Sequence, residues 1–344
     1  MKQGVLLAGE PMALFIAQSE GPLECVDGYT AAIAGAEYNV AVGLRRLEHT
    51  AGYLTKLGDD PFGRRIVRGM RENGIGTELT ALCAGRPTGF MLKSKVHAGD
   101  PEIFYFRKGS AASTLCAADV EKLDLSCYGV LHMTGILPAL SDSCRAAALA
   151  LADRARDEGM FFSFDPNLRP QLWPDRETMT RFVNDLAARA DLFLPGIAEG
   201  QTLTGARTCE EIAAFYLGLG AKTVVVKNGS AGAYACTPEK SFWAQGFPVR
   251  QVVDTVGAGD GFAVGVLSGL LEGLPLCEAV RRGNAVGAIQ VMSVGDNDGL
   301  PTRAQLAAFM EKGEPGRVKI MFLVTTASRG KCMMVYHSMP KEIG

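Results

Sequence analysis

The residues best suited to chemistry lie in one short segment, residues 254–260, with the sequence DTVGAGD. Its glycines allow the backbone to turn tightly just before an apolar, small-residue helix, which we predict over about 261–272. The first N–H groups of a helix lack partners within it, and together with the helix dipole they favour a bound anion. We therefore predict that Gly257, Ala258 and Gly259 form an anion hole for a transferring phosphoryl group.

Asp260 follows this turn at the head of the same predicted helix. It could accept a proton from an attacking hydroxyl group while the amides stabilise charge on the phosphoryl oxygens. We expect the helix dipole to keep the pKa of Asp260 low, and a weak base suffices because phosphoryl transfer depends mainly on alignment and charge stabilisation. The alternative is a turn that only caps a helix. The segment has neither the dinucleotide-binding glycine spacing nor a P-loop lysine, so both of those nucleotide loops are disfavoured.

The elements around this turn alternate between short apolar runs and helical stretches. Apolar runs predict buried strands at 5–8, 130–133, 161–164, 192–194 and 223–226. Amphipathic or Ala-rich stretches predict helices at 36–47, 62–73, 142–158 and 176–190. The alternation predicts an α/β fold with a doubly wound, mostly parallel sheet flanked by helices. Residues 249–253, VRQVV, are predicted as one more strand leading into the phosphate turn.

Two stretches, about 12–33 and 86–108, break this rhythm and have strand-like patterns of their own. They predict a small β-sheet that projects from the main domain as a lid. Side chains alternate between the two faces of a strand. We therefore expect Tyr105 and Arg107 on a polar face, and Phe104 and Phe106 on an opposite packing face.

Composition excludes several classes of partner. Lys and Arg total 35 and Asp and Glu total 37, so a net charge of −2 offers no general attraction for nucleic acid or an acidic membrane. No apolar run approaches the roughly 18 residues needed to span a bilayer or resembles a secretory signal. Nine scattered cysteines without a Cys-x-x-Cys pair argue against a disulfide framework or a zinc site. We expect a cytoplasmic protein with reduced thiols, binding neither nucleic acid nor membrane.

The sequence resembles the ribokinase-like, or PfkB, carbohydrate kinase family over roughly residues 4–312. Two ordered signatures carry the resemblance: residues 35–41 (GAEYNVA), supported by 58–63 (GDDPFG), and residues 254–267. The resemblance implies an ATP-dependent kinase domain over residues 1–312 with a β lid, and makes Asp260 the catalytic base. Residues 313–344 follow as an atypical tail, for which an edge strand, an interface segment and a poorly ordered end all stay open.

The resemblance also implies where ATP binds. Residues 227–232, KNGSAG, match the family's nucleotide-side turn, and a helical asparagine matches a position near adenine. The implied nucleotide contacts are Lys227, Gly229, Gly232, Thr255 and Asn284. The alternative is that these residues have no ligand. A glycine turn after a strand is common in proteins without any binding role, and an Asn in a helix often caps the helix or is exposed to solvent.

Two positions match cation sites of the family. Glu199 corresponds to the last residue of an Asn-x-x-Glu motif linked to Mg²⁺, but Gly196 stands where the family has Asn. The resemblance therefore implies that Glu199 acts through water; the alternative is an ordinary exposed glutamate at a helix start. Asp254 matches a position for a monovalent cation such as K⁺, and a capping role is equally open.

Within the family, the likeness is greatest to the branch that acts on 2-keto-3-deoxygluconate. The matching segments are residues 9–12 (GEPM), 105–107 (YFR), 165–173 (DPNLRPQLW) and 295–302. Independently, Arg107 and Arg169 offer planar forks suited to a carboxylate, and Tyr105 offers a hydroxyl donor. The resemblance adds Gly35 and Asn39 as contacts to the sugar chain, although Gly35 could simply serve a close turn.

The predicted function is thus ATP-dependent phosphorylation of the terminal hydroxyl of a sugar acid, most closely 2-keto-3-deoxygluconate. A fructokinase- or ribokinase-type kinase of neutral sugars is the nearest alternative. A sensor that binds sugar and nucleotide without turnover is the alternative from another class. Lid strands with exposed edges favour a homo-oligomer, and a dimer that associates through the lid is one form it could take.

Overall fold

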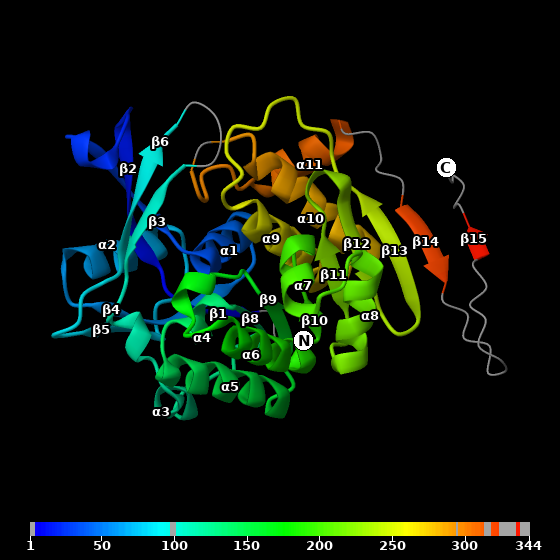
Figure 1. Ribbon diagram of the computed structural model, residues 1–344, viewed down its shortest axis with the longest axis horizontal. Helices are drawn as coiled ribbons and strands as arrows, with labels where there is room; N and C mark the ends of the chain where they lie inside the picture. The colour runs from blue at the N-terminus through cyan, green and yellow to red at the C-terminus, as the bar shows by residue number, and fades with distance from the viewer. Residues whose placement is uncertain (1–3, 97–100, 294, 313–317, 323–334, 338–344) are drawn as a thin grey trace.

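The computed structural model describes residues 4–96, 101–293, 295–312, 318–322 and 335–337 (Figure 1). A large sheet forms the centre of the molecule, with one buried apolar cluster on each of its faces. A separate small sheet stands to one side (Figure 1). The predicted α/β architecture with a projecting β lid is therefore confirmed.

The large sheet has eleven strands among the described residues, and the predicted apolar runs form five of them. From one edge to the other they are β15 (Val335–His337), β14 (Val318–Phe322), β13 (Lys240–Gln245), β12 (Gly232–Cys236), β11 (Val224–Lys227), β10 (Leu192–Phe193), β9 (Phe161–Asp165), β8 (Tyr128–Thr134), β1 (Gly4–Ala8), β4 (Ala51–Gly58) and β5 (Thr80–Cys83). Neighbouring strands from β11 to β5 are parallel, and those from β11 to β15 pair in antiparallel fashion.

Helices cover both faces of this sheet. The face under α5, α6 and α8 buries one apolar cluster, and α1, α9 and α10 bury the other. The helices are α1 (Ala36–Arg46), α2 (Pro61–Glu72), α3 (Ala117–Glu121), α4 (Ile136–Ala139), α5 (Asp142–Asp157), α6 (Arg176–Arg189), α7 (Ile197–Thr204), α8 (Cys209–Leu219), α9 (Ala258–Leu271), α10 (Leu276–Gln290) and α11 (Arg303–Lys312). In parallel sheets of this kind, ligands bind beyond the carboxyl ends of the strands.

The small sheet, called the lid from here on, has the strand order β3 (Tyr29–Ala34), β2 (Met12–Glu20), β6 (Phe90–Lys95) and β7 (Ile103–Phe106). Its inner face buries Met12, Leu14, Ala34 and Met91. The prediction that Phe104 and Phe106 form a packing face on β7 was wrong. Phe104 and Phe106 are 47% and 51% exposed, because they lie on the opposite, outer face of the lid.

The strand predicted at 249–253 was also wrong. This segment has no strand partner; its described backbone contact is from the Val253 N–H to the carbonyl of Val291, at 2.7 Å. The edge of β13 that it could have paired with is taken by β14. Val249 and Val252 instead line a cavity, described below, and Val252 is 54% exposed.

The tail contributes two short edge strands. β14 pairs with β13, and β15 pairs with β14, so the edge-strand interpretation applies to 318–322 and 335–337. The remaining residues of 313–344 lie outside those described. In the portion of the chain that the structure covers, no helix has the length and apolarity needed to cross a bilayer. The eight cysteines among the described residues are free thiols.

Candidate active site

The turn before α9 has the shape that the sequence predicts. Gly257 is the N-cap residue of α9 and has φ +79, a region that side chains disfavour. A Cβ atom at this position would also overlap the main-chain carbonyl oxygen of Asp296. Glycine is therefore required here twice over. In the first turn of α9, the Ala258 N–H donates to the Thr255 carbonyl oxygen at 3.3 Å, and the N–H groups of Gly259 and Asp260 have no acceptor within the helix.

Asp260 lies in the first turn of α9, and its carboxylate is held by α1. Asn39 donates a hydrogen bond of 2.8 Å to Asp260 Oδ2, and Asn297 donates one of 2.9 Å to Asn39 Oδ1. Burial raises the pKa of Asp260 to about 7; the Asn39 hydrogen bond lowers it, whereas nearby Asp165 raises it. The expected low pKa was wrong, because burial has the largest effect on this carboxyl group. A carboxylate with a pKa near 7 is a better matched general base at neutral pH.

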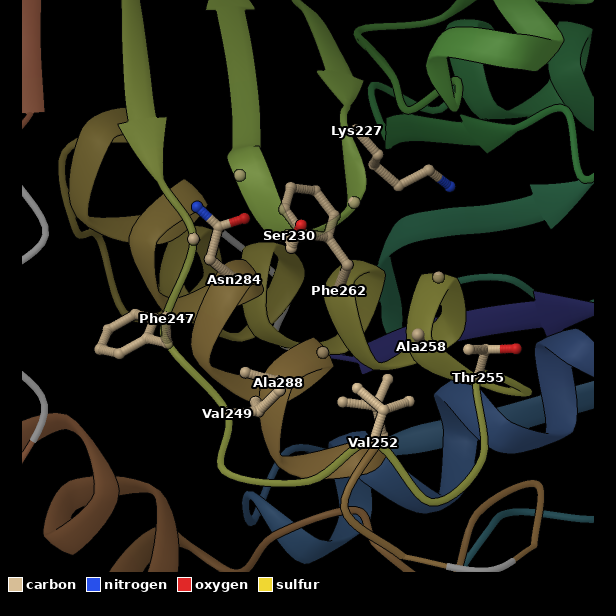
Figure 2. Close-up of a pocket in the computed structure, with 16 residues that line it drawn as sticks. Lys227, Ser230, Phe247, Val249, Val252, Thr255, Ala258, Phe262, Asn284 and Ala288 are labelled. Carbon is tan, nitrogen blue, oxygen red and sulfur yellow. The ribbon is translucent and has the colours of Figure 1, made fainter. Parts of the chain in front are cut away.

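A first cavity, of about 400 Å³, opens between the β11–β12 turn and helices α9 and α10 (Figure 2). Its wall contains all five residues expected to contact the nucleotide, which are Lys227, Gly229, Gly232, Thr255 and Asn284. Its other members are mostly glycines and apolar side chains such as Phe247, Val249, Val252 and Phe262. A cavity with apolar walls and a few polar groups suits a planar base and its ribose.

Asn284 has a structural role at this wall. Its Nδ2 donates to the carbonyl oxygens of Ala244 and Gln245 at 3.0 and 3.1 Å, which ties α10 to the end of β13. Figure 2 shows its side chain beside the cavity, with Oδ1 on the other side from Nδ2. Oδ1 is thus the atom through which Asn284 could accept a hydrogen bond from an adenine amino group.

A second cavity, of about 530 Å³, lies between the lid and the carboxyl ends of the parallel strands. The five residues expected to contact the substrate, Gly35, Asn39, Tyr105, Arg107 and Arg169, all line it together with Asp260. The two cavities share Lys227, Gly229, Thr255 and Gly259. Their junction is therefore at the N-terminus of α9, where a phosphoryl group could pass from one to the other.

Comparisons with known proteins agree with this geometry. The family model for pfkB family carbohydrate kinases matches residues 3–303. The chain belongs to the pfkB carbohydrate kinase family. It is 48% identical, over 90% of its own length and 96% of the other, to a protein of Bacillus subtilis (strain 168) named 2-dehydro-3-deoxygluconokinase.

Two solved structures extend the comparison. A PfkB protein from Polaromonas sp. JS666 superimposes with a TM-score of 0.82 at 46% identity, covering 89% of this chain and 99% of that one. A fructokinase double mutant from Vibrio cholerae O395, solved with fructose, ADP and a potassium ion, has a TM-score of 0.80 at 26% identity, over 90% and 98% of the two chains.

The two arginines of this pfkB kinase differ in their surroundings. Arg107 is buried, and its Nε lies 2.6 Å from Glu10 Oε2, while Ser110 donates to Glu10 Oε1. Its charge is thus already matched by a carboxylate. Arg169 is half-buried and donates to the carbonyl oxygen of Leu168 at 2.9 Å, and the described residues give it no ion pair. Of the two forks, Arg169 is the one whose charge is left for a ligand.

Glu199 lies at the start of α7 and faces the second cavity. Its two oxygens accept the N–H groups of Gly196 and Leu168 at 2.7 and 2.8 Å, and burial raises its pKa. Nearby, Lys227 Nζ forms an ion pair with Asp165. Across the described ranges, no group of three or more His, Cys, Asp or Glu side chains could hold a metal ion directly. The water-mediated contact of Glu199 with a cation stays a prediction.

Asp254 does not have an open position for a cation. Its Oδ1 accepts the Val256 N–H at 3.0 Å, which is the capping role left open above, and its Oδ2 lies 2.8 Å from Lys93 Nζ. Lys93 also reaches Asp296 Oδ1 at 3.2 Å. A monovalent cation bound by the Asp254 carboxylate does not fit this arrangement, because an ammonium group is already there.

Several side chains of the site were not among the predicted ones: Glu10, Lys93, Asp165 and Asp296. Asp165 had a usable signal, since it is the last residue of β9 and parallel strands place such residues at one edge. Lys93 also had a signal in the sequence, because it occupies an inward-facing position of a lid strand, where an apolar residue is expected.

Proposed function

We propose that this kinase transfers the γ-phosphoryl group of MgATP to the terminal hydroxyl of 2-keto-3-deoxygluconate. The observation that carries the proposal is the second cavity, which combines the half-buried base Asp260 with the guanidinium of Arg169, for which the described residues give no ion pair. A sugar with a carboxylate at one end and a hydroxyl at the other matches those two groups. The 48% identity to a protein named 2-dehydro-3-deoxygluconokinase supports the same substrate.

The proposed reaction is a single displacement. Asp260 accepts the proton of the terminal hydroxyl while the hydroxyl oxygen bonds to the γ-phosphorus of ATP. At the same time the bond between the γ-phosphorus and the bridging oxygen breaks, and ADP leaves. The N–H groups at the start of α9 stabilise the charge on the phosphoryl oxygens. Lys227 lines both cavities at their junction, where its ammonium group is paired with Asp165 and can also contact the phosphates. Glu199 would hold Mg²⁺ through water, and that ion supplies charge neutralisation at the phosphates.

A kinase of neutral sugars is the second candidate. The pairing of Arg107 with Glu10 favours it, because only one guanidinium then faces the ligand uncompensated. A sensor without turnover is disfavoured, because Asp260 is held by Asn39 beside the helix start that would bind the phosphoryl group. The matched substrate pair for this choice is 2-keto-3-deoxygluconate and 3-deoxyfructose, which differ only in a carboxylate against a hydroxymethyl group.

An ADP-release assay with this pair and a panel of other sugars tests the proposal. Arg169→Met should lose about 2 to 4 kcal/mol of transition-state binding for the acid and much less for 3-deoxyfructose, because only the acid meets the guanidinium with a charge. Arg207→Met, at an exposed position, is the control. Fast turnover of fructose or ribose without turnover of any sugar acid would overturn the substrate assignment.

We also propose a cytoplasmic homodimer that associates through the outer face of the lid. Phe104 and Phe106 are exposed there, and Phe106 stacks on Phe90 with ring centroids 4.6 Å apart. Exposed aromatic side chains on a sheet face are typical of an interface. Sedimentation velocity of the wild type and of Phe106→Glu checks this: loss of a dimer in the variant is expected, and a monomeric wild type would contradict it.

A further inference from the structure

Lys93 is a charged residue at an inward position of the lid. Along β6, Met91 and Lys93 face the same side, and β2 and β7 flank the strand. The side chain of Lys93 is only 4% exposed, and its ammonium group lies between Asp254 Oδ2 and Asp296 Oδ1, at 2.8 and 3.2 Å. A lysine is seldom buried unless it is paired, so these two carboxylates account for its position.

Both carboxylates belong to segments that shape the turn before α9, at residues 254–260, called the catalytic turn from here on. Asp254 binds the N–H of Val256 through its other oxygen, which fixes the backbone just before Gly257. The main chain of Asp296 packs against Gly257 so closely that a side chain there would overlap it. The next residue, Asn297, binds the Asn39 that holds Asp260. The position of this pair of carboxylates is thus linked to the anion hole and to the base.

Two converging buried carboxylates require a positive charge between them. Burial alone would lower the pKa of Lys93, but Asp296 and Asp254 outweigh burial and raise it, so that the group is an ammonium ion. A desolvated K⁺ or NH₄⁺ ion, bound by the same oxygens, would provide the same charge. In this protein the positive charge between the two carboxylates comes from the side chain of Lys93.

We propose that the ammonium group of Lys93 is a tethered substitute for a free monovalent cation beside the anion-hole turn. Lys93 is thus a positioning residue, which acts on Asp260 and on the turn through Asp254 and Asp296. The consequence is that this kinase needs no K⁺. A second consequence is that a lid strand, β6, is fastened directly to the catalytic turn.

The kinetic test compares wild type, Lys93→Ala and Lys93→Met at constant ionic strength, with KCl, NH₄Cl or tetramethylammonium chloride. The wild type should have the same kcat in all three salts. Lys93→Ala should fall at least about tenfold in tetramethylammonium and recover about fivefold or more, saturably, with K⁺ or NH₄⁺. Lys93→Met should not recover, because its side chain fills the space. Lys95→Ala, on an exposed residue of the same strand, is the control.

Thermal unfolding without substrate gives a second readout. The inference rests on the proposed kinase activity for the kinetic test, but not for this one. The midpoint of Lys93→Ala should rise with K⁺ concentration relative to tetramethylammonium, and that of the wild type should not. A purely structural ion pair would leave the variant insensitive to the choice of cation.

If Lys93→Ala fails to fold, measurements on the wild type alone still test the proposal. Saturable stimulation of the wild type by K⁺, or a K⁺-specific rise in its unfolding midpoint, would overturn the proposal. Full activity of Lys93→Ala in tetramethylammonium would overturn it as well. Absence of turnover with every sugar, accompanied by the expected midpoint shift in Lys93→Ala, would refute the proposed function and leave the cation site standing.

Discussion

Replacing Asp260 with Asn tests the burial of the proposed base. The pKa of Asp260 is about 7 in the folded protein, against an ordinary value of 3.8. This difference corresponds to at most about 4 kcal/mol, and contact of the carboxyl group with the open cavity reduces it. Because the folded-state pKa is raised, protonated Asp260 favours the folded state, and that stability is lost as pH rises from about 4 to about 7. Asn carries no such charge at any pH.

Urea unfolding of wild type and Asp260→Asn at pH 5, 6, 7 and 8 measures this effect. The variant should gain stability relative to wild type as pH rises, by about 1 to 3 kcal/mol between pH 5 and pH 8. Asp157→Asn, which alters an exposed carboxylate, is the control and should show a flat difference. A flat or falling difference for Asp260→Asn would refute the conclusion that this carboxyl group resists ionisation in the folded state.

The same variant tests catalysis. Asp260→Asn should bind ATP with little change and lose at least about a hundredfold in kcat, because no group then accepts the hydroxyl proton. In the wild type, log(kcat/KM) should rise with pH and level off near pH 7, since the base must be ionised. A pH-independent rate from pH 5 to 8 with retained activity in the variant would exclude Asp260 as the base.

Two further predictions concern the cavity walls. Gly257→Ala should abolish most activity and destabilise the fold, because a positive φ costs about 1 kcal/mol and the new Cβ atom would overlap the main chain of Asp296. Gly273→Ala is the control, since Gly273 has a similar φ of +75 but open space around it. This control should lose only the stability that the positive φ costs, and its kcat should not change. Asn284→Leu should raise KM for ATP by about tenfold and leave KM for the sugar acid unaltered, through loss of a polar contact worth about 1 to 2 kcal/mol. Steady-state kinetics and thermal unfolding check both, and an active Gly257→Ala or an unchanged KM for ATP would contradict them.

Much of the fold was predictable because its signals are local. The buried parallel strands appear as apolar runs, and the proposed anion hole and base lie in one uninterrupted segment, 254–260. The error at 249–253 has a physical origin: its valines resemble a strand, but Val249 and Val252 line a cavity and the segment joins no sheet. Apolar composition alone does not distinguish a strand from a ligand-facing loop.

The ion pairs of the site could not be predicted in the same way. Lys93 and Asp254 are 161 positions apart, and Arg107 and Glu10 are 97 apart, so no sequence spacing reports these pairs. The pKa of Asp260 was misjudged for the same reason. The groups that surround it come from α1 and β9, and only the folded chain brings them together.

The most direct test of the proposed reaction is the product formed from 2-keto-3-deoxygluconate and ATP. Phosphorus NMR of that product should show one phosphomonoester coupled to the two protons of the terminal methylene group, formed in equal amount with ADP. Asp260→Asn should form it at least about a hundredfold more slowly. A product phosphorylated at another oxygen, or ADP release without a phosphorylated sugar acid, would contradict the account.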